Sequence, residues 1–197
     1  MITESENVNI LKEQTLNKDH FIHVPLCRQE TEYTCGVACV QSILKCYGRE
    51  YSQEMLAITL QTKPILGTDF QDIINFMRQI GFKASFFEDM SIDNLKYLIN
   101  NKITPMLIIQ AWAGSGVDYA SDWKNAHYVI ACGYDKNNII FMDPYTLGNY
   151  TYIPVDELLK RWHAIDKRVH RYYRSGLIIK EEHCSFEYDP CVIKYLG

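Results

Sequence analysis

Cys35 is the residue of this sequence with the clearest potential for chemistry. It follows Thr34 at the start of a predicted helix, where unpaired backbone N–H groups and the helix dipole favour an anion. Its thiolate, the nucleophilic form, should therefore form more readily than that of an ordinary cysteine. Cys39 and Cys46 lie farther along the same helix and are interpreted as small buried apolar residues, which is also the alternative for Cys35. Position alone thus makes Cys35 the candidate nucleophile.

A candidate base and a carboxylate follow in the second half of the chain. His127 opens a predicted strand and Asp143 ends the next one across a hairpin turn at residues 135–138, so antiparallel pairing brings both to one end of a sheet. The pattern does not fix the register, and a β-bulge or the lean of the side chains has to close the remaining gap. An imidazole beside a thiol stabilises a thiolate–imidazolium pair, and a carboxylate orients the ring. The alternatives are a structural strand histidine and a turn aspartate before Pro144.

Other residues are candidates for holding the substrate. Gln29 precedes Cys35 in a polar, loop-like stretch, and its amide could donate to a developing oxyanion together with the Cys35 N–H. Gly36 would let a substrate backbone approach closely. Trp112 and Trp123 flank a long polar loop and are interpreted as either core cover or substrate wall. We therefore predict Gly36, Trp112 and Trp123 as substrate-binding residues.

The hydrophobic pattern indicates which elements position these residues. The first half has apolar residues at helical spacing, for example behind a capping box predicted for Thr68 and Gln71, whereas the second half has short runs of β-branched and aromatic residues. The predicted helices are residues 35–47, 52–60, 68–80, 91–100 and 155–163, and the predicted strands are residues 105–112, 127–134, 139–142, 150–153 and 176–180. Helices followed by an antiparallel sheet predict an α+β domain.

Size and composition indicate one domain. With 197 residues, of which 47% are hydrophobic, the chain can bury one core and has little room for two. Residues 1–20 carry too few apolar groups to offset the entropy of ordering, so we expect a flexible arm there. The predicted domain spans residues 21–182, and residues 183–197 form a C-terminal extension. No signal peptide and no transmembrane span is predicted, because the apolar runs are only as long as strands.

Charge and cysteine usage exclude several classes of partner and cofactor. The formal net charge of −4 provides no basic field for a nucleic acid or an anionic membrane. The seven cysteines are odd in number and irregularly spaced, which favours a reducing compartment. We predict a cytoplasmic location, or export by a route that needs no N-terminal signal. The Cys and His spacings, including His183-Cys184 with Cys191, lack the short pairs of a zinc site, so neither a metal nor a cofactor is expected.

Taken together, these residues resemble the C39 family of papain-like cysteine peptidases over about residues 23–155. The resemblance rests on three blocks in the order of that family: Gln29-x5-Cys35-Gly36-x-Ala38-Cys39, His127-Tyr-Val-Ile and Asp143-Pro144. It implies a papain-like α+β fold, with N-terminal helices packed on a C-terminal antiparallel sheet. It also implies peptide-bond hydrolysis by a Cys35–His127–Asp143 triad, with Gln29 in the oxyanion hole and a peptide or protein as substrate. The later stretches Tyr150-Thr-Tyr-Ile-Pro154 and Arg161-Trp162-His163 resemble stand-alone C39-like proteins without a transporter domain.

Two other functions remain open at this point. The same triad could transfer the acyl group to an amine instead of water, in transamidation or transpeptidation. Alternatively, the chain could be a catalytically silent module that binds a peptide without cutting it, although the complete set of four residues favours catalysis.

Overall fold

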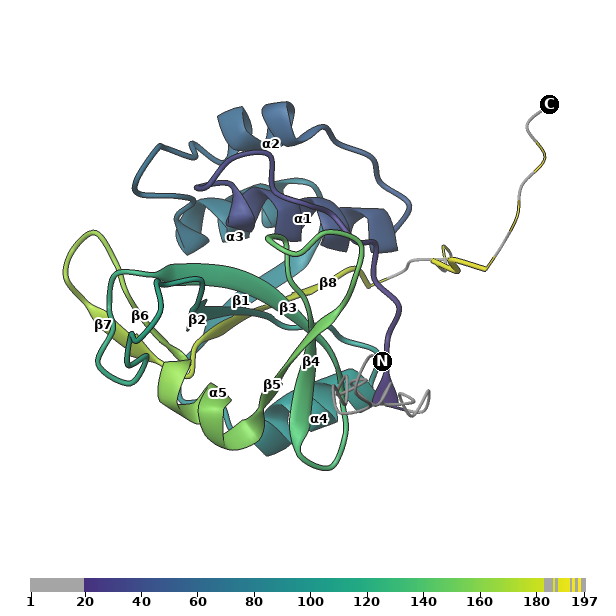
Figure 1. Ribbon diagram of the computed structural model, residues 1–197. Coiled ribbons are helices and arrows are strands. Elements are labelled where there is room, and N and C mark those ends of the chain that lie inside the picture. Colours follow the sequence, from purple (N-terminus) through teal and green to yellow (C-terminus); the bar gives the residue numbers. More distant parts are fainter. Residues whose placement is uncertain (1–19, 183–185, 187, 192, 194, 196–197) are drawn as a thin grey trace, which may run out of the picture.

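The computed structural model describes residues 20–182, 186, 188–191, 193 and 195 (Figure 1). Nearly all of the predicted arm and the pair His183-Cys184 lie outside these residues. The elements, in chain order, are α1 (Cys35–Cys46), α2 (Gln53–Thr59), α3 (Phe70–Gln79), β1 (Lys83–Phe87), α4 (Ile92–Asn100), β2 (Met106–Gln110), β3 (Ala126–Tyr134), β4 (Asn138–Met142), β5 (Thr151–Pro154), α5 (Val155–Arg161), β6 (His163–Ile165), β7 (Arg171–Tyr173) and β8 (Gly176–Lys180). No helix in this part of the chain has the length and apolar character needed to cross a membrane.

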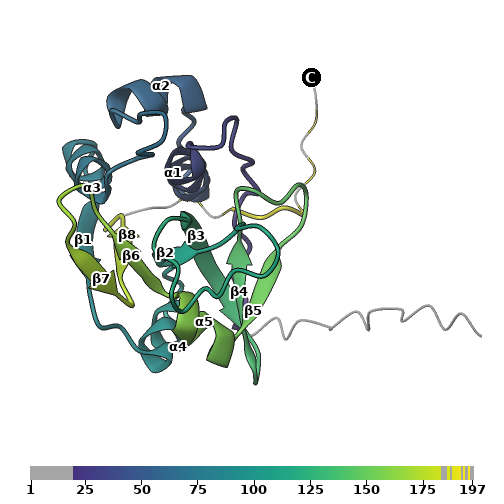
Figure 2. The same ribbon diagram turned by 60° about the vertical axis from the view of Figure 1, so that its left-hand side comes forward.

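A six-stranded antiparallel sheet in the order β1-β8-β2-β3-β4-β5 forms the centre of the fold. Helices α1 to α3 lie on one side of this sheet, and α4 and α5 lie on the other (Figures 1 and 2). Strands β6 and β7 form a separate hairpin. This arrangement confirms the predicted α+β class, with N-terminal helices packed on a C-terminal antiparallel sheet. Strands β1, β6 and β7 were not predicted, because runs of only three to five residues carry almost no alternating pattern.

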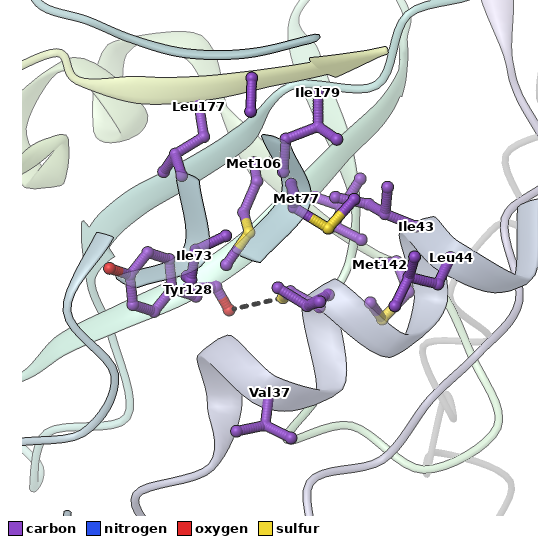
Figure 3. Close-up of a cluster of buried hydrophobic side chains, with 14 of the residues drawn as sticks. Val37, Ile43, Leu44, Ile73, Met77, Met106, Tyr128, Met142, Leu177 and Ile179 are labelled. Carbon is purple, nitrogen blue, oxygen red and sulfur yellow. Dashed lines mark hydrogen bonds between the residues drawn. The ribbon is translucent and has the colours of Figure 1, made fainter. Parts of the chain in front are cut away.

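Helix α1 is anchored by apolar residues that are buried inside the fold. Val37, Val40 and Leu44 are fully buried, and Figure 3 shows Leu44 in the same cluster as Met106 of β2 and Met142 of β4. The Cys39 thiol lies 3.5 Å from the backbone oxygen of Tyr128 in β3. This packing fixes the first turn of α1 over the start of β3.

The other face of the sheet has its own core beneath α4 and α5. Its largest member, Trp162, is 1% exposed, and its indole N–H donates to the Ser175 carbonyl at 2.9 Å. Together the two cores hold the sheet between two layers of helices, so the ends of β3 and β4 are rigidly placed.

Strand β3 contains a β-bulge at Cys132. Gly133 pairs with Ile140, but Ile130 pairs with Met142, so one extra residue lies in β3. The Cys132 carbonyl accepts a hydrogen bond from the Ile22 N–H at 2.7 Å. Because paired residues share a face, the bulge decides which face every later residue of β4 occupies.

Two sequence predictions about helix ends were wrong. Helix α3 is capped by Asp69, whose carboxylate accepts from the Gln71 N–H at 2.9 Å, and not by Thr68. Thr68 instead accepts a hydrogen bond from the Tyr128 hydroxyl at its carbonyl and contacts Thr62 through its own hydroxyl. The last predicted helix ends at Arg161, and His163 belongs to β6.

Candidate active site

Cys35, His127 and Asp143 meet at one end of the sheet. Nε2 of His127 lies 2.8 Å from Oδ1 of Asp143. A carboxylate accepts only, so Nε2 carries the proton and Nδ1 is left to act on the Cys35 thiol, whose ionisation the His127 ring favours. The three residues are 8%, 7% and 5% exposed, respectively. A thiol, an imidazole and a carboxylate thus lie together in a site that is largely shielded from water, and the last two are joined by a hydrogen bond.

The bulge in β3 explains why Asp143 reaches His127. If the pairing of Ile130 with Met142 continues by one residue, Asp143 lies opposite Val129, on the same face of the sheet as His127. If Cys132 instead paired regularly with Phe141 in the register of Gly133 and Ile140, Asp143 would lie opposite Ile130, on the other face. The bulge allowed for in the sequence analysis is therefore present and closes the gap.

Asp143 also organises the loop that follows it. Its Oδ1 accepts a second hydrogen bond, from the Tyr145 N–H at 2.9 Å, and its Oδ2 accepts from the Thr146 hydroxyl at 3.1 Å. Both oxygens of the Asp143 carboxylate therefore accept hydrogen bonds from the loop, and these bonds fix its orientation toward His127.

The surroundings of Cys35 favour its thiolate. Burial by itself would raise the pKa of this thiol, but the hydrogen bond and charge of His127 and backbone hydrogen bonds from Tyr128 and Gly36 outweigh it and lower the pKa. Burial likewise opposes the charge on His127, yet its contacts with Asp143 and Cys35 raise the imidazole pKa to about 9. These opposite shifts stabilise a thiolate–imidazolium pair at neutral pH.

The other buried cysteines have the opposite electrostatic character. Burial raises the pKa of the thiols of Cys27, Cys39 and Cys132, and it raises that of Cys46 to about 12. Among the described cysteines, only Cys35 combines burial with a lowered pKa, and His127 is the largest cause of the lowering. Within the described residues no group of His, Cys, Asp and Glu side chains could hold a metal ion.

A model of the peptidase C39 family matches residues 23–165. The chain belongs to the peptidase C39 family. Three solved structures share the fold of this C39 domain. The peptidase domain of Streptococcus ComA, a bi-functional ABC transporter, is 20% identical with a TM-score of 0.59 over 81% of this chain and 100% of that one.

The second structure is a double glycine motif protease from an AMS/PCAT transporter in complex with its leader peptide, 17% identical with a TM-score of 0.57 over 84% and 96% of the two chains. The third, a C39-like peptidase from Bacillus anthracis, is 14% identical with a TM-score of 0.58 over 83% and 98%. A search of curated proteins finds no matching sequence. Family and fold together support a cysteine peptidase.

Gln29 of the C39 domain is nearly buried, at 9% exposure. Its backbone N–H donates to the Pro144 carbonyl at 2.9 Å, which ties this segment to the loop after Asp143. Its side-chain Nε2 donates one hydrogen to the Thr31 carbonyl at 2.7 Å, and the Oε1 atom is buried without a partner in the described residues. Among the described residues the second hydrogen of Nε2 has no acceptor, and it is the one that could meet a ligand.

Gly36 is required by close packing within the protein. A Cβ atom at this position would lie 3.0 Å from Cβ of Thr68 and 3.1 Å from the ring of Tyr128. These contacts are a reason for glycine at position 36 that the sequence alone could not reveal. The reason is separate from the predicted close approach of a substrate backbone.

The two tryptophans predicted as substrate-binding have different surroundings. Trp123 packs against the β6–β7 hairpin, with its ring 4.2 Å from that of His163 and the Arg171 guanidinium 4.6 Å above it. Of its two interpretations, these contacts favour core cover. Trp112 is 52% exposed and contacts the ring of Tyr145. Sequence analysis missed Tyr145, although its place in the Asp143-Pro144 turn was a usable signal.

The thiolate–imidazolium pair gives this C39 domain a predictable pH response. Alkylation of Cys35 by iodoacetamide should be fast at neutral pH, below the range in which an ordinary thiol ionises. The imidazolium that sustains this state is lost as the pH rises through about 9. In His127→Ala only burial and backbone contacts act on the thiol, so its pKa should rise and alkylation should need higher pH. An unchanged pH profile in His127→Ala would contradict the pairing; mass spectrometry of the alkylated peptide makes the measurement.

Proposed function

We propose that this protein is a cysteine peptidase that hydrolyses peptide bonds with Cys35, His127, Asp143 and Gln29. The observation that carries the proposal is the bond between His127 and Asp143 beside a Cys35 thiol whose pKa His127 lowers, in a member of a cysteine peptidase family. The order and types of the three groups match the needs of nucleophilic acyl transfer.

Acylation begins when the Cys35 thiolate attacks the carbonyl carbon of the scissile amide. The carbonyl oxygen becomes an oxyanion, which the Cys35 N–H and the second hydrogen of Gln29 Nε2 stabilise. The His127 imidazolium then gives its proton to the amide nitrogen as the C–N bond breaks, and the amine leaves. Asp143 keeps the ring oriented throughout and remains ionised.

Deacylation returns the enzyme to its starting state. Neutral His127 removes a proton from water, and the resulting hydroxide attacks the thioester carbonyl of acyl-Cys35. The C–S bond breaks, the carboxylic acid leaves, and the thiolate re-forms beside the imidazolium. No group beyond the protein and water is needed for this sequence of steps.

The substrate class in this proposal is a peptide or protein. The AMS/PCAT protease was solved with a leader peptide, and peptide binding on the same fold supports the extension of that class to this chain. We further propose that residues 21–182 act as one domain, between an N-terminal arm of residues 1–20 and an extension of residues 183–197. The net charge of −4 supports a protein that acts without nucleic acid or membrane.

We further propose that the protein is located in a reducing, cytoplasmic compartment or is exported without an N-terminal signal. The described cysteines Cys27, Cys35, Cys39, Cys46, Cys132 and Cys191 are all free thiols, which supports this location.

A peptidyl acylating probe tests the proposal. Intact mass spectrometry should find one acyl group on the wild type and on Cys39→Ala, and none on Cys35→Ala or His127→Ala. Cys39 is the matched control because it lies one turn along α1 and its thiol pKa is raised by burial. Loss of the acyl group in water supports a peptidase, whereas transfer to an added amine without hydrolysis would indicate an acyl transferase. No labelling of the wild type would indicate a binding module.

A further inference from the structure

Trp112 and Tyr145 form an exposed aromatic pair at the end of the sheet that carries His127. Their ring centroids lie 4.5 Å apart with the planes tilted by 34°. Trp112 is 52% exposed and Tyr145 is 45% exposed. Aromatic side chains of this size normally bury most of their surface, so two in contact that both stay about half-exposed form an apolar surface open to solvent.

The backbone at Trp112 is strained in a way that maintains this surface. Its φ angle is +59°, a region that bulky residues rarely adopt. The position is fixed on both sides, because the Ala111 N–H donates to the Asn125 carbonyl at 3.0 Å and the Ala113 N–H donates to the Tyr119 hydroxyl at 3.3 Å. Strain that the surrounding structure enforces in this way is typical of functional sites.

The aromatic pair is linked directly to the proposed base. Oδ1 of Asp143 accepts a hydrogen bond from Nε2 of His127 at 2.8 Å and another from the N–H of Tyr145 at 2.9 Å. One carboxylate oxygen therefore positions both the imidazole and the backbone that carries the Tyr145 ring. The pair lies on the His127 side of the site, since Trp112 follows β2, in which Ile109 pairs with His127.

The chemistry of acyl transfer determines which part of a substrate lies beside His127. The leaving amine must approach the imidazolium that protonates it, and the residue that begins at this nitrogen extends past His127. We propose that Trp112 and Tyr145 form the wall of the subsite for the residue immediately after the scissile bond, and that this subsite prefers a large apolar or aromatic side chain. The inference rests on the proposed peptidase function.

The test compares cleavage of a peptide library by the wild type and by single variants. The residue after each cut is read by mass spectrometry, and Cys35→Ala provides the background. The wild type should favour Phe, Leu, Trp and Met after the cut over Gly and Asp. Trp112→Ala and Tyr145→Ala should each lower kcat/KM for the apolar class by about tenfold and leave the Gly class nearly unchanged, since burial of part of one side chain is lost.

Two controls separate a subsite effect from general damage. Trp112→Phe keeps an aromatic ring and should keep the preference. Tyr97→Ala removes a tyrosine that is 67% exposed on α4, on the other side of the sheet from α1, and should change nothing. Labelling of Cys35 by a probe with no group after its reactive carbonyl should proceed at the wild-type rate in Trp112→Ala.

The outcomes for the subsite and for the proposed function differ. Cys35-dependent cleavage with no preference after the cut, or an equal loss for all peptides in Trp112→Ala, would overturn the subsite and leave the peptidase standing. Absence of any Cys35-dependent cleavage would overturn both.

Discussion

Replacement of Cys35 by alanine is expected to lower peptide hydrolysis by on the order of 10⁴-fold or more. The variant has no atom that can form the thioester, so any remaining rate comes from binding and from the oxyanion donors. The measurement is kcat/KM on a peptide that the wild type cleaves. Because Cys35 is buried and small, its removal should leave the melting temperature within a few degrees of the wild-type value.

Cys39→Ala is the matched control for this variant. It removes a thiol from the same helix and the same core, but from a site where burial raises the thiol pKa. It should cost some stability and little activity. Equal activity losses in Cys35→Ala and Cys39→Ala would mean that damage to α1, and not loss of a nucleophile, explains both.

Replacement of Asp143 by alanine is expected to lower kcat/KM by on the order of 10³-fold. The His127 ring loses the acceptor that orients it, and Nε2 is left without a partner in a buried site. Burial disfavours the charged imidazolium, and in this variant the Asp143 carboxylate no longer offsets that effect. The His127 pKa therefore falls from about 9. The alkaline limb of the pH–rate profile should therefore move to lower pH, which a purely structural role would not produce.

Thr146→Val provides the comparison for Asp143→Ala. It removes the hydrogen bond to Oδ2 of Asp143 and leaves the bond between Oδ1 and His127 in place. Activity should fall only slightly, with the alkaline limb unmoved. If Thr146→Val reproduced the full effect of Asp143→Ala, loop order and not ring orientation would be the function of the carboxylate.

Local signals in the sequence were enough to predict the fold class and the helix that carries Cys35. The helix begins at Cys35 as predicted, because its apolar stripe and Gly48, with φ +70°, mark both ends. The strand that starts near His127 and the hairpin turn before β4 were also predictable. The turn is stabilised by Asp135, whose carboxylate accepts from the N–H groups of Asn137 and Asn138.

Features that depend on distant contacts were not predictable in this way. The second bond that Asp143 makes to Tyr145, and the contact of Tyr145 with Trp112, depend on where two loops meet in space. The packing that requires glycine at position 36 comes from Thr68 and Tyr128, which are far away in the sequence. These contacts between distant residues cannot be identified from a single sequence.

The extra residue at Cys132 makes the chain unequally tolerant of insertions and deletions. A longer turn at residues 135–138 would leave the pairing of Ile130 with Met142 unchanged, so evolution or design could vary that loop freely. As long as the bulge stays at Cys132, the gain or loss of a single residue between His127 and Cys132 would turn the His127 side chain to the face opposite that of Asp143, even if every strand still formed. The chemistry at this site thus depends on the number of residues between His127 and the bulge, which is a property of the strand and not of any single side chain.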